Sequence, residues 1–372
     1  MRKRSVAVVT GVVLLLLAGC SSDQVAEVDR GETDGAAVAA AQDAVVAAMA
    51  PRTAEDSKLP EAGPKAATGI SMVAITCAAA IEGCRAVSDA HIEAAEAMGW
   101  STTLIDGGGS PQGWNEAMES AIALQPDVIA LGAILPEAIQ GSLQTAKDAG
   151  IITVCTQCGG SGDAQKLIDV STGDDVNAAI GTALGNYIVA GSEGSADVLM
   201  WYYPEFGISK VRFDAAKTVI DGCSGCSTET FEVKISEWGT SLPGRIQSLI
   251  QQNPSINWMY SPADETAIDA MNAVEAAGAS GSIFVVGGNG NIQALETIAT
   301  SPVYIATAAV SYAASSWAGI DGANRLLNGE APVETTSSVR VFDQTNVDEI
   351  VEGEYYSGDV DFRAVYRSIW GV

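Results

Sequence analysis

From residue 69 onward the sequence alternates between short apolar runs and longer segments with helical periodicity. Apolar runs such as "ISMVAIT" (70–76) and "DVIALG" (127–132) are followed by segments such as 84–99, in which apolar residues recur with the spacing of one helix face. Short, continuously apolar strands that alternate with amphipathic helices are typical of right-handed βαβ units, in which helices cover both faces of a parallel sheet. The sequence therefore predicts an α/β fold.

The alternation restarts after "LIDVSTGDD" (167–175), which divides it into two halves. The strands are too many for one open sheet, so we expect two doubly wound parallel-sheet lobes of about 130 residues each. In the first half, further strands are expected at 101–106 and 151–155, and helices at 111–124 and 136–150. In the second half, strands are expected at 196–201, 228–235, 256–260, 282–288 and 303–309, and helices at 175–190, 208–220, 243–252, 265–277, 292–299 and 312–328.

The N-terminal residues have the features of a bacterial export signal. Three basic residues, 2–4, precede an apolar stretch, 6–17, that is too short to span a membrane permanently. The following "LLAGC" resembles the lipobox of bacterial lipoproteins, in which cleavage leaves the cysteine as a lipid-carrying N-terminus. Residues 1–19 are therefore expected to be a signal peptide and Cys20 the lipid attachment site, with an uncleaved anchor as the alternative. In either case the body lies outside the cytoplasmic membrane, where thiols oxidise.

The six cysteines other than Cys20 form three pairs that are close in sequence. The pairs are Cys77 and Cys84, Cys155 and Cys158, and Cys223 and Cys226. In an oxidising compartment this pattern favours three local disulfides, with free buried thiols or a four-thiolate zinc site as alternatives. The first two pairs could also be joined across their loops, because the sequence cannot decide the connectivity. A redox role for "CTQC" is disfavoured, because two glycines follow it where a helix would have to begin. The only histidine, His91, lies far in sequence from any CxxC and is expected at the surface.

Composition limits the partners that the body can have. The formal net charge is −27 at pH 7, which excludes electrostatic binding to nucleic acid or to an anionic membrane surface. Hydrophobic residues make up 47% of the chain, which is enough for a large core. Residues 20–67 are expected to be the lipid-anchored cysteine and a flexible linker. Within them the Ala-rich segment 36–50 either packs on the body as a helix or acts as a spacer, and the lack of a large apolar face favours the spacer.

Candidate binding residues follow the ends of the expected strands. In doubly wound sheets, ligands bind beyond the carboxyl ends of the strands, where the strand order reverses. The first half offers Thr76 and then Thr156 and Gln157 at such ends, and the second half offers "WYYPEFG" (201–207), "SEWGTS" (236–241), "SPADE" (261–265) and "GGNGN" (287–291). Aromatic faces beside small amides and acids suit ligands with C–H faces and hydroxyl edges, chiefly sugars and polyols, although some of these aromatics are expected to be core.

Three stretches resemble a known family. "QPDVIALGAILPEAIQGSLQTAKDAGIITVCTQ" (125–157) looks like the corresponding stretch of ribose- and galactose-type periplasmic binding proteins. "INWMYSPADETAIDAMNAVEAAG" (256–278) with the following "IFVVGGNGNIQALETI" is similar to their "ND-x-x-A-x-G-A" helix and "VVGFDG" strand, and "VRVFDQTNVDEI" (339–350) is similar to their tail after the third interlobe crossing. The resemblance covers about residues 69–350 and rests on order and spacing.

The resemblance implies a type 1 solute-binding lipoprotein of an ABC importer, with two lobes joined by three crossings that close on a small polar solute. It places lobe 1 at 68–171 and 312–341, and lobe 2 at 172–311 and 342–372, with hinges near 171–173, 310–312 and 339–342. The implied partners are a sugar or polyol, ABC permease and ATPase subunits, and the membrane through the lipid anchor. The chain is expected to be a monomer on the extracytoplasmic face, without a cofactor, a metal or a nucleic-acid partner. A ligand-binding sensor lipoprotein is the alternative.

When the family's binding positions are transferred residue by residue, this chain differs from the family at several of them. Thr156 and Gln157 stand where the family often has a charged pair, Asp264 follows an alanine in place of the family's Asn, and Asn289 replaces the acid of "FDG". An aromatic is retained as Trp238. The expected ligand-binding residues are Thr76, Glu82, Thr156, Gln157, Trp201, Tyr203, Phe206, Arg212, Trp238, Asp264, Asn289 and Tyr312, with Lys210 as a further basic candidate. The first two disulfides would hold two loops at one rim of lobe 1 in shape before the ligand arrives.

Enzymatic interpretations find little support in the sequence. It contains no G-x-S-x-G, H-E-x-x-H or P-loop motif, and "GGNGN" lacks the spacing of a dinucleotide fingerprint. A Ser-His-Asp mechanism has no candidate base at the strand ends. Glu82 and Asp264 could form a carboxylate pair for glycoside hydrolysis, but a binding protein would use the same residues as hydroxyl acceptors. We therefore expect a binding protein and not an enzyme.

Overall fold

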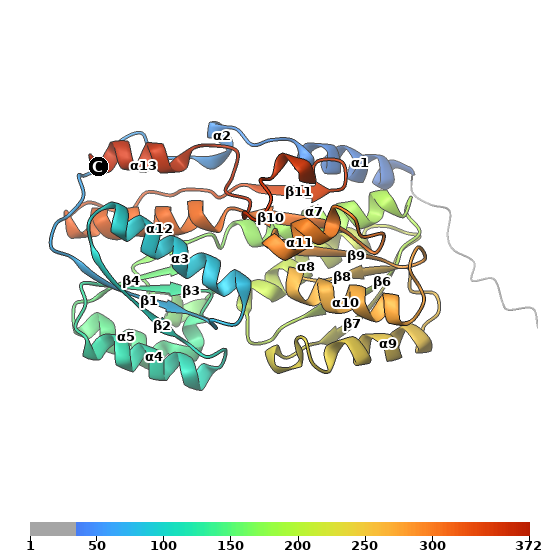
Figure 1. Ribbon diagram of the computed structural model, residues 1–372, viewed down its shortest axis with the longest axis horizontal. Coiled ribbons are helices and arrows are strands. Elements are labelled where there is room, and N and C mark those ends of the chain that lie inside the picture. Colours follow the sequence, from blue (N-terminus) through green and yellow to red (C-terminus); the bar gives the residue numbers. More distant parts are fainter. Residues whose placement is uncertain (1–34) are drawn as a thin grey trace, which may run out of the picture.

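The computed structural model describes residues 35–372 as two α/β lobes that lie side by side (Figure 1). Lobe 1 contains β1 (Ser71–Thr76), α3 (Glu82–Ala97), β2 (Ser101–Asp106), α4 (Pro111–Ala123), β3 (Val128–Gly132), α5 (Gln140–Asp148), β4 (Ile152–Thr156), α6 (Gly162–Gln165), β5 (Val170–Thr172), α12 (Tyr312–Leu327) and α13 (Phe362–Trp370). Lobe 2 contains α1 (Gly35–Met49), α7 (Val176–Gly191), β6 (Asp197–Tyr202), α8 (Gly207–Asp221), β7 (Ser227–Glu232), α9 (Leu242–Gln252), β8 (Trp258–Tyr260), α10 (Asp264–Ala276), β9 (Phe284–Asn289), α11 (Ile292–Ile298), β10 (Tyr304–Val310) and β11 (Val339–Asp343). A short helix, α2 (Ala54–Ser57), lies between α1 and β1.

The two sheets share one strand order. The lobe 1 sheet runs β2-β1-β3-β4-β5, and its pairs are all parallel. The lobe 2 sheet runs β11-β10-β9-β8-β6-β7, and only its β10–β11 pair is antiparallel. Without β11, both sheets have the doubly wound order in which the second strand lies outside the first, so each has a reversal point beside its first strand. The predicted α/β fold with two doubly wound lobes is confirmed.

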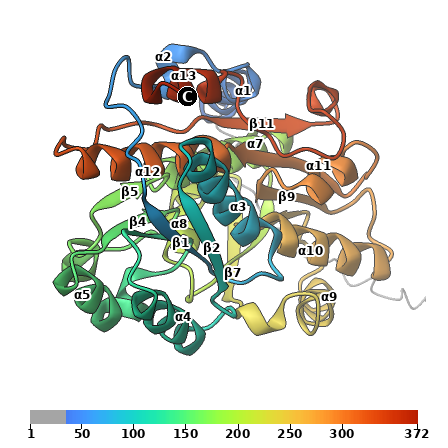
Figure 2. The same cartoon turned by 60° about the vertical axis from the view of Figure 1, so that its left-hand side comes forward.

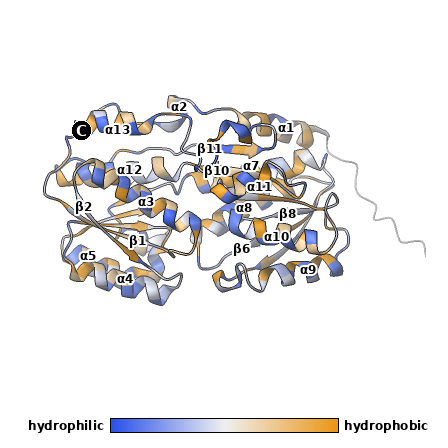
Figure 3. Cartoon of the chain, viewed as in Figure 1, coloured by the Kyte–Doolittle hydropathy of each residue, from blue (hydrophilic) through white to orange (hydrophobic). Residues whose placement is uncertain are grey.

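Helices cover both faces of each sheet. In lobe 1, α3 and α12 pack on one face and α4 and α5 on the other, whereas in lobe 2 α7 and α8 face one side and α9, α10 and α11 the other. The central strands between these layers, such as β1, β3 and β6, consist mainly of buried apolar residues, whereas the edge strands β2 and β7 are largely exposed (Figure 3). Strand β3, for example, is buried along its whole length. Burial on both faces explains why the central strands appear in the sequence as continuous apolar runs. Within residues 35–372, no helix is long and apolar enough to span a membrane.

The ends of the lobes differ from the expected boundaries. Residues 339–341 were expected in lobe 1, but they begin β11, which pairs with β10 in lobe 2. Residues 362–370 were expected in lobe 2, but they form α13, which packs on α12 in lobe 1. There Trp370 stacks on Trp317 with ring centroids 5.2 Å apart, and its indole N–H donates to Asp321 at 2.7 Å. The third crossing therefore occupies 328–338, and the chain returns to lobe 1 after β11.

The Ala-rich segment forms a helix that packs on the body and is not a spacer. Helix α1 lies against α7 and beside β11, above the main body of lobe 2 (Figure 2). Its end is held by two reciprocal contacts: Arg52 Nε donates to the Val339 carbonyl, and Arg340 Nε donates to the Met49 carbonyl, each at 2.8 Å. The following residues continue onto lobe 1, where the Trp100 indole donates to the Ala67 carbonyl at 2.9 Å.

The single histidine is buried and does not lie at the surface. His91 is 0% exposed, and its Nε2 lies 2.8 Å from Thr156 Oγ1. Burial lowers the pKa of His91 to about 3, so the ring is neutral at ordinary pH. Helical periodicity alone did not reveal that this position faces the sheet, because α3 packs on β1 with one side and on α12 with another.

The six cysteines of the body form three local disulfides, as expected. They join Cys77 to Cys84, Cys155 to Cys158 and Cys223 to Cys226, with Cα–Cα distances of 5.5, 5.9 and 5.3 Å. The thiols that a zinc site would need are therefore bonded to one another. Among the described residues, no cluster of His, Cys, Asp or Glu could hold a metal ion. The lipidation site expected at Cys20 lies outside the described residues.

Candidate ligand-binding site

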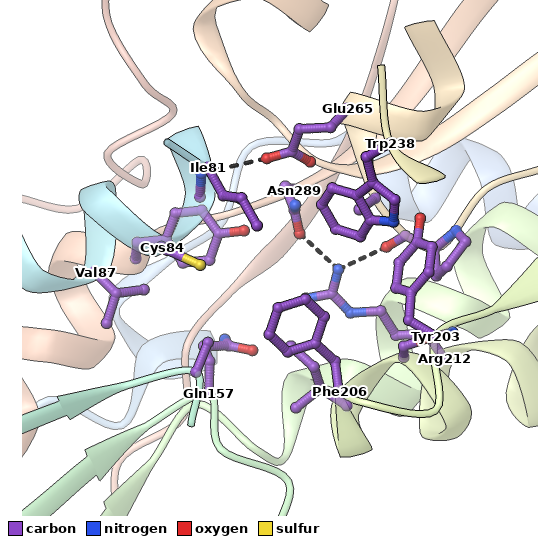
Figure 4. Close-up of a pocket in the computed structure, with 17 residues that line it drawn as sticks. Ile81, Cys84, Val87, Gln157, Tyr203, Phe206, Arg212, Trp238, Glu265 and Asn289 are labelled. Carbon is purple, nitrogen blue, oxygen red and sulfur yellow. Dashed lines mark hydrogen bonds between the residues drawn. The ribbon is translucent and has the colours of Figure 1, made fainter. Parts of the chain in front are cut away.

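A pocket lies between the two lobes, beyond the carboxyl ends of both sheets (Figure 4). Its volume is about 50 Å³. Lobe 1 contributes Ile81, Gly83, Cys84, Val87, Ala133 and Gln157. Lobe 2 contributes Tyr203, Phe206, Ile208, Ser209, Arg212, Trp238, Pro262, Ala263, Glu265 and Asn289, and Tyr312 comes from the second crossing. These residues follow β1, β3 and β4 in one sheet and β6, β7, β8, β9 and β10 in the other, so the pocket occupies the position that doubly wound sheets offer to a ligand.

Three aromatic rings form one wall of the pocket. The ring centroids of Tyr203 and Trp238 are 4.6 Å apart, and Phe206 lies 6.0 Å from Trp238 and 6.4 Å from Tyr203. Phe206 also reaches across the cleft to Trp114 of lobe 1, with a centroid distance of 6.3 Å. The wall therefore packs against both lobes. It presents C–H and π surface to anything bound in the pocket.

The Arg212 guanidinium is the buried cation of the pocket. Arg212 is 2% exposed and extends from α8. Its Nε donates to Asn177 Oδ1 at 2.7 Å, and its Nη1 donates to the Pro262 carbonyl at 2.8 Å and to Asn289 Oδ1 at 2.6 Å. These acceptors are neutral, and the second terminal nitrogen, Nη2, is buried without a partner. The arrangement fixes the guanidinium and leaves one donor for a bound acceptor.

Gln157 brings a polar side chain to the lobe 1 side of the pocket. It lies between Cys155 and Cys158, and its backbone N–H donates to the Thr172 carbonyl at 2.9 Å. Both its side-chain oxygen and its nitrogen are buried without partners. The amide oxygen needs a hydrogen-bond donor and the amide nitrogen needs an acceptor. One hydroxyl of a ligand can serve as either, and a molecule with several hydroxyls can satisfy both.

Backbone strain is concentrated at this pocket. Three of its lining residues other than glycine have positive φ, namely Ala133 at 56°, Gln157 at 61° and Asn289 at 131°. They account for half of the six such residues in the part of the chain that the structure describes. Left-handed backbone at non-glycine residues is costly and is often found at functional sites. The disulfide around Gln157 helps to hold that conformation.

Glu265 is the acidic residue at the rim of the pocket. Its Oε1 accepts a long hydrogen bond of 3.4 Å from the backbone N–H of Gly83 on the opposite lobe, while Oε2 is buried without a partner. Burial, followed by the negative charge of Asp264, raises the pKa of Glu265 to about 7. Near neutral pH the side chain can therefore donate or accept a hydrogen bond.

Seven of the expected binding residues line the pocket. They are Gln157, Tyr203, Phe206, Arg212, Trp238, Asn289 and Tyr312. Lys210, the further basic candidate, is exposed and pairs with Asp214 on the same helix, so it does not reach the pocket. Helix α8 thus directs Arg212 inward and Lys210 outward, which follows from their spacing of two residues on a helix.

The other five expected residues do not line the pocket, and three of them are buried within lobe 1 or lobe 2. Thr76 is fully buried at the end of β1. Thr156 Oγ1 contacts the His91 ring and, at 2.9 Å, Thr172 Oγ1. The Trp201 ring packs on Phe231, and its indole donates to Thr266 at 3.1 Å. Each side chain points away from the cleft because successive strand residues alternate between faces.

The two remaining residues, Asp264 and Glu82, are structural acids. Asp264 is fully buried; it accepts hydrogen bonds from the Tyr304 hydroxyl at 2.6 Å, the Thr307 hydroxyl at 2.8 Å and the Asn291 N–H at 2.7 Å. Glu82 Oε1 accepts the N–H of Ile292, the first residue of α11, at 2.9 Å. This bond links the lobes and places a carboxylate at a helix N-terminus. Since neither acid lines the pocket, they are not the glycosidase pair considered from the sequence.

Sequence reasoning missed Glu265 and the small residues that line the pocket. Glu265 directly follows Asp264, and a signal for it existed in the two adjacent acids that open α10. Only packing determines which of two adjacent acids faces the cleft. Gly83 gave no chemical signal, although a Cβ built there would lie 3.4 Å from the Tyr312 hydroxyl and 3.7 Å from Glu265 Oε1.

Comparison with known proteins gives one family and many similar folds. A family model described as "Periplasmic binding protein domain" matches residues 75–331. No curated protein sequence matches the chain.

Several solved structures have the same fold, and each match spans nearly the whole length of the solved chain. An ABC sugar transporter subunit from Rhodobacter sphaeroides has a TM-score of 0.66 at 21% identity, and the match covers 75% of this chain and 99% of that one. An ABC transporter solute-binding protein from Mycobacterium smegmatis with bound glycerol has a TM-score of 0.68 at 20% identity, and the match covers 77% of this chain and 98% of that one. An ABC transporter solute-binding protein from Agrobacterium vitis with bound allitol has a TM-score of 0.65 at 21% identity, and the match covers 75% of this chain and 97% of that one.

Proposed function

The chain belongs to the periplasmic binding protein domain family, and from this premise we propose that it captures a sugar or polyol between its lobes for an ABC importer. The type 1 binding-protein fold expected from the sequence is confirmed by the family match and the solved neighbours. The family and these neighbours are solute-binding proteins and not enzymes, as the sequence also led us to expect.

One observation carries the choice of ligand class: buried polar atoms without partners face an aromatic wall. Gln157 lacks partners for both ends of its amide, Arg212 for Nη2 and Glu265 for Oε2. Buried polar groups are normally satisfied, so these atoms indicate what the occupant provides. A polyhydroxylated molecule supplies hydroxyls for them and C–H faces for Tyr203, Phe206 and Trp238. A purely apolar ligand would leave all of these groups unsatisfied at a cost of about 1–3 kcal/mol each.

In this proposal, the lobes close on the solute and the closed protein then delivers it to a membrane permease. After removal of residues 1–19, the lipid on Cys20 would hold the body at the extracytoplasmic face of the membrane, where the closed form meets the permease of an ABC importer. The bonds between Glu82 and Ile292 and between Glu265 and Gly83 join residues from opposite lobes. The lobes must therefore break these bonds to open and form them again around the solute.

Ligand-dependent stabilisation without turnover tests the proposal. A ligand at a hundred times its Kd raises the free energy of unfolding by about 2.7 kcal/mol. We expect a panel of sugars and polyols to include at least one member that raises the Tm and lowers the radius of gyration, with the ligand recovered unchanged. Trp238→Ala should make the free energy of binding of that ligand less favourable by about 1–3 kcal/mol, because the ring no longer stacks on it. A panel that leaves the Tm of the native protein unchanged, together with no small molecule in mass spectra of the purified native protein, would contradict the proposal.

A further inference from the structure

Arg212 is a buried cation without an ion-pair partner among the described residues. Three arginines are buried within residues 35–372, namely Arg212, Arg325 and Arg340, and each is at most 4% exposed. Arg325 pairs with Asp321 at 2.7 Å, and Arg340 pairs with Asp359 at 3.0 Å. Arg212, in contrast, donates only to amide and carbonyl oxygens. Because a buried charge is normally paired, the missing counter-charge is one that a bound molecule can bring.

The two acids that open α10 form no ion pair with Arg212. Asp264 does not line the pocket, and its carboxylate accepts hydrogen bonds from the hydroxyls of Tyr304 and Thr307. Glu265 lines the pocket, but burial and the charge of Asp264 raise its pKa to about 7, so it is partly protonated at neutral pH. Apart from Arg212 and Glu265, no residue that lines the pocket carries a formal charge. The lining therefore has a net positive charge near neutral pH.

The buried atoms of the pocket lining that lack partners are mainly hydrogen-bond donors (Figure 4). Three of them are nitrogens that carry hydrogen: Arg212 Nη2, Gln157 Nε2 and Trp238 Nε1. The acceptors without partners are Gln157 Oε1 and Glu265 Oε2, and the second of these holds a proton part of the time near neutral pH. A hydroxyl both donates and accepts, whereas a carboxylate only accepts, through two oxygens. The surplus of donors therefore favours a ligand that carries a carboxylate in addition to its hydroxyls.

The acidity of the whole chain does not oppose an anion in this pocket. The formal net charge is −27, but exposed charges are screened beyond about 8–10 Å at physiological ionic strength. A buried pair is screened much less, and a hydrogen bond between two charged groups is about twice as strong as one between neutral groups. The charge of the body therefore slows the approach of an anion, whereas the Arg212 guanidinium determines how tightly the anion is held.

We propose that the interlobe pocket prefers sugar acids, whose carboxylate pairs with Arg212 while their hydroxyls bind the other polar groups. The inference rests on the proposed function and adds the charge of the ligand and the residue that recognises it. The carboxylate accepts a hydrogen bond from Arg212 Nη2, the hydroxyls satisfy the Gln157 amide, and the C–H face of the sugar lies on Trp238. A monoanion matches the single guanidinium, whereas a phosphate dianion would bury a second negative charge without a counter-charge.

Calorimetric titration at pH 7 with matched pairs of ligands tests the inference. The pairs are glycerol and glycerate, sorbitol and gluconate, and galactose and galacturonate, and within each pair a carboxylate replaces one CH₂OH group. For the native protein we expect at least one acid to bind at least about tenfold more tightly than its neutral partner, because a charge-assisted hydrogen bond replaces a neutral one. In Arg212→Gln this preference should disappear, even where both affinities fall. In Lys210→Ala, which removes an exposed cation from the same helix, the preference should persist.

The outcomes separate the inference from the proposed function. If the neutral member of every pair that binds does so as tightly as its acid, the inference is overturned and sugar capture still stands. Tighter binding of galactose 6-phosphate than of galacturonate overturns the choice of a carboxylate. A preference for acids that persists in folded Arg212→Gln overturns the role of Arg212. If Arg212→Gln does not fold, the ranking within each pair on the native protein still decides the charge preference. Binding of no sugar, polyol or sugar acid overturns the proposed function and the inference with it.

Discussion

Gly159 of lobe 1 and Gly207 of lobe 2 meet across the cleft with their backbones in contact. A Cβ built on Gly207 would lie 2.6 Å from the Gly159 carbonyl oxygen, and a Cβ built on Gly159 would lie 2.6 Å from the backbone nitrogen of Ile208. Gly159 directly follows the Cys155–Cys158 disulfide, and Gly207 is the first residue of α8, the helix that carries Arg212. The closed form therefore depends on the absence of side chains at both positions.

Gly207→Ala should weaken ligand binding at least tenfold by opposing closure. A methyl group placed against backbone atoms forces a shift that costs about 1–3 kcal/mol, and only the closed state makes this contact. Titration calorimetry measures the affinity, and small-angle scattering measures the radius of gyration with ligand. Gly244→Ala is the matched control in the same lobe, because a Cβ there meets nothing within 4 Å. Equal affinities for the two variants would contradict the closure argument.

Removal of the Cys155–Cys158 disulfide should weaken binding more than removal of Cys223–Cys226. Both bridges have the same sequence separation of 3, so their contributions through the unfolded state should be similar, about 2 kcal/mol or less. Only the first encloses Gln157, whose left-handed backbone points an amide into the pocket. Double Cys→Ala variants of each pair should therefore lose comparable stability to urea, while only the 155/158 variant loses affinity by about tenfold. Equal losses of affinity would contradict this assignment.

Arg212→Lys should reduce both affinity and stability. Lysine cannot reproduce the donors that reach Asn177 Oδ1, the Pro262 carbonyl and Asn289 Oδ1. Each acceptor left without a partner costs about 1–3 kcal/mol, so we expect a lower urea midpoint and affinity reduced by about 10- to 100-fold. Lys210→Ala on the same helix removes an exposed ion pair with Asp214 and should change stability by less than about 1 kcal/mol. A Lys variant with native affinity would remove Arg212 from the site.

Glu265→Gln should change how stability depends on pH. Burial and the neighbouring Asp264 charge raise the pKa of Glu265 from 4.5 to about 7. The native state then holds the proton more tightly than the unfolded chain, so the contribution of this group to the free energy of unfolding falls as pH rises from about 4.5 to about 7. Urea unfolding at pH 4.5 and pH 8 should therefore show that the free energy of unfolding falls further with pH in the native protein than in Glu265→Gln. The difference between the two falls should be at most about 3 kcal/mol. Parallel pH profiles would contradict the shifted pKa.

Much of the fold could be predicted from local sequence because its signals are local. A strand buried on both faces, such as β3, needs a continuous apolar run, and a helix over a sheet needs an apolar stripe. Helix α13 had such a signal, since Phe362, Tyr366 and Trp370 recur at helical spacing and are all buried. The sequence contained nothing to indicate that this stripe packs on α12 of lobe 1, because a stripe does not identify its partner.

Three local disulfides were the favoured pairing, but the sequence left open a pairing across the first two loops, and only the structure fixed the connectivity. The candidate site was only partly predictable. Residues at strand ends such as Gln157, Trp238 and Asn289 could be identified because the carboxyl ends of parallel strands gather at one edge. Strand position does not reveal which face a side chain takes, so Thr156 was expected in the pocket although it contacts His91 in the core.

What the sequence alone determined was the alternation of strand and helix and the set of strand ends from which the pocket is built. The tertiary structure decided which atoms at those ends are free. Asp264 and Glu265 are neighbours in sequence, yet Tyr304 and Thr307 of β10 occupy the carboxylate of Asp264, and only Glu265 faces the cleft. Such partners are distant in sequence and meet only when α10 packs on the sheet. No local pattern can therefore predict which acid remains available to a ligand.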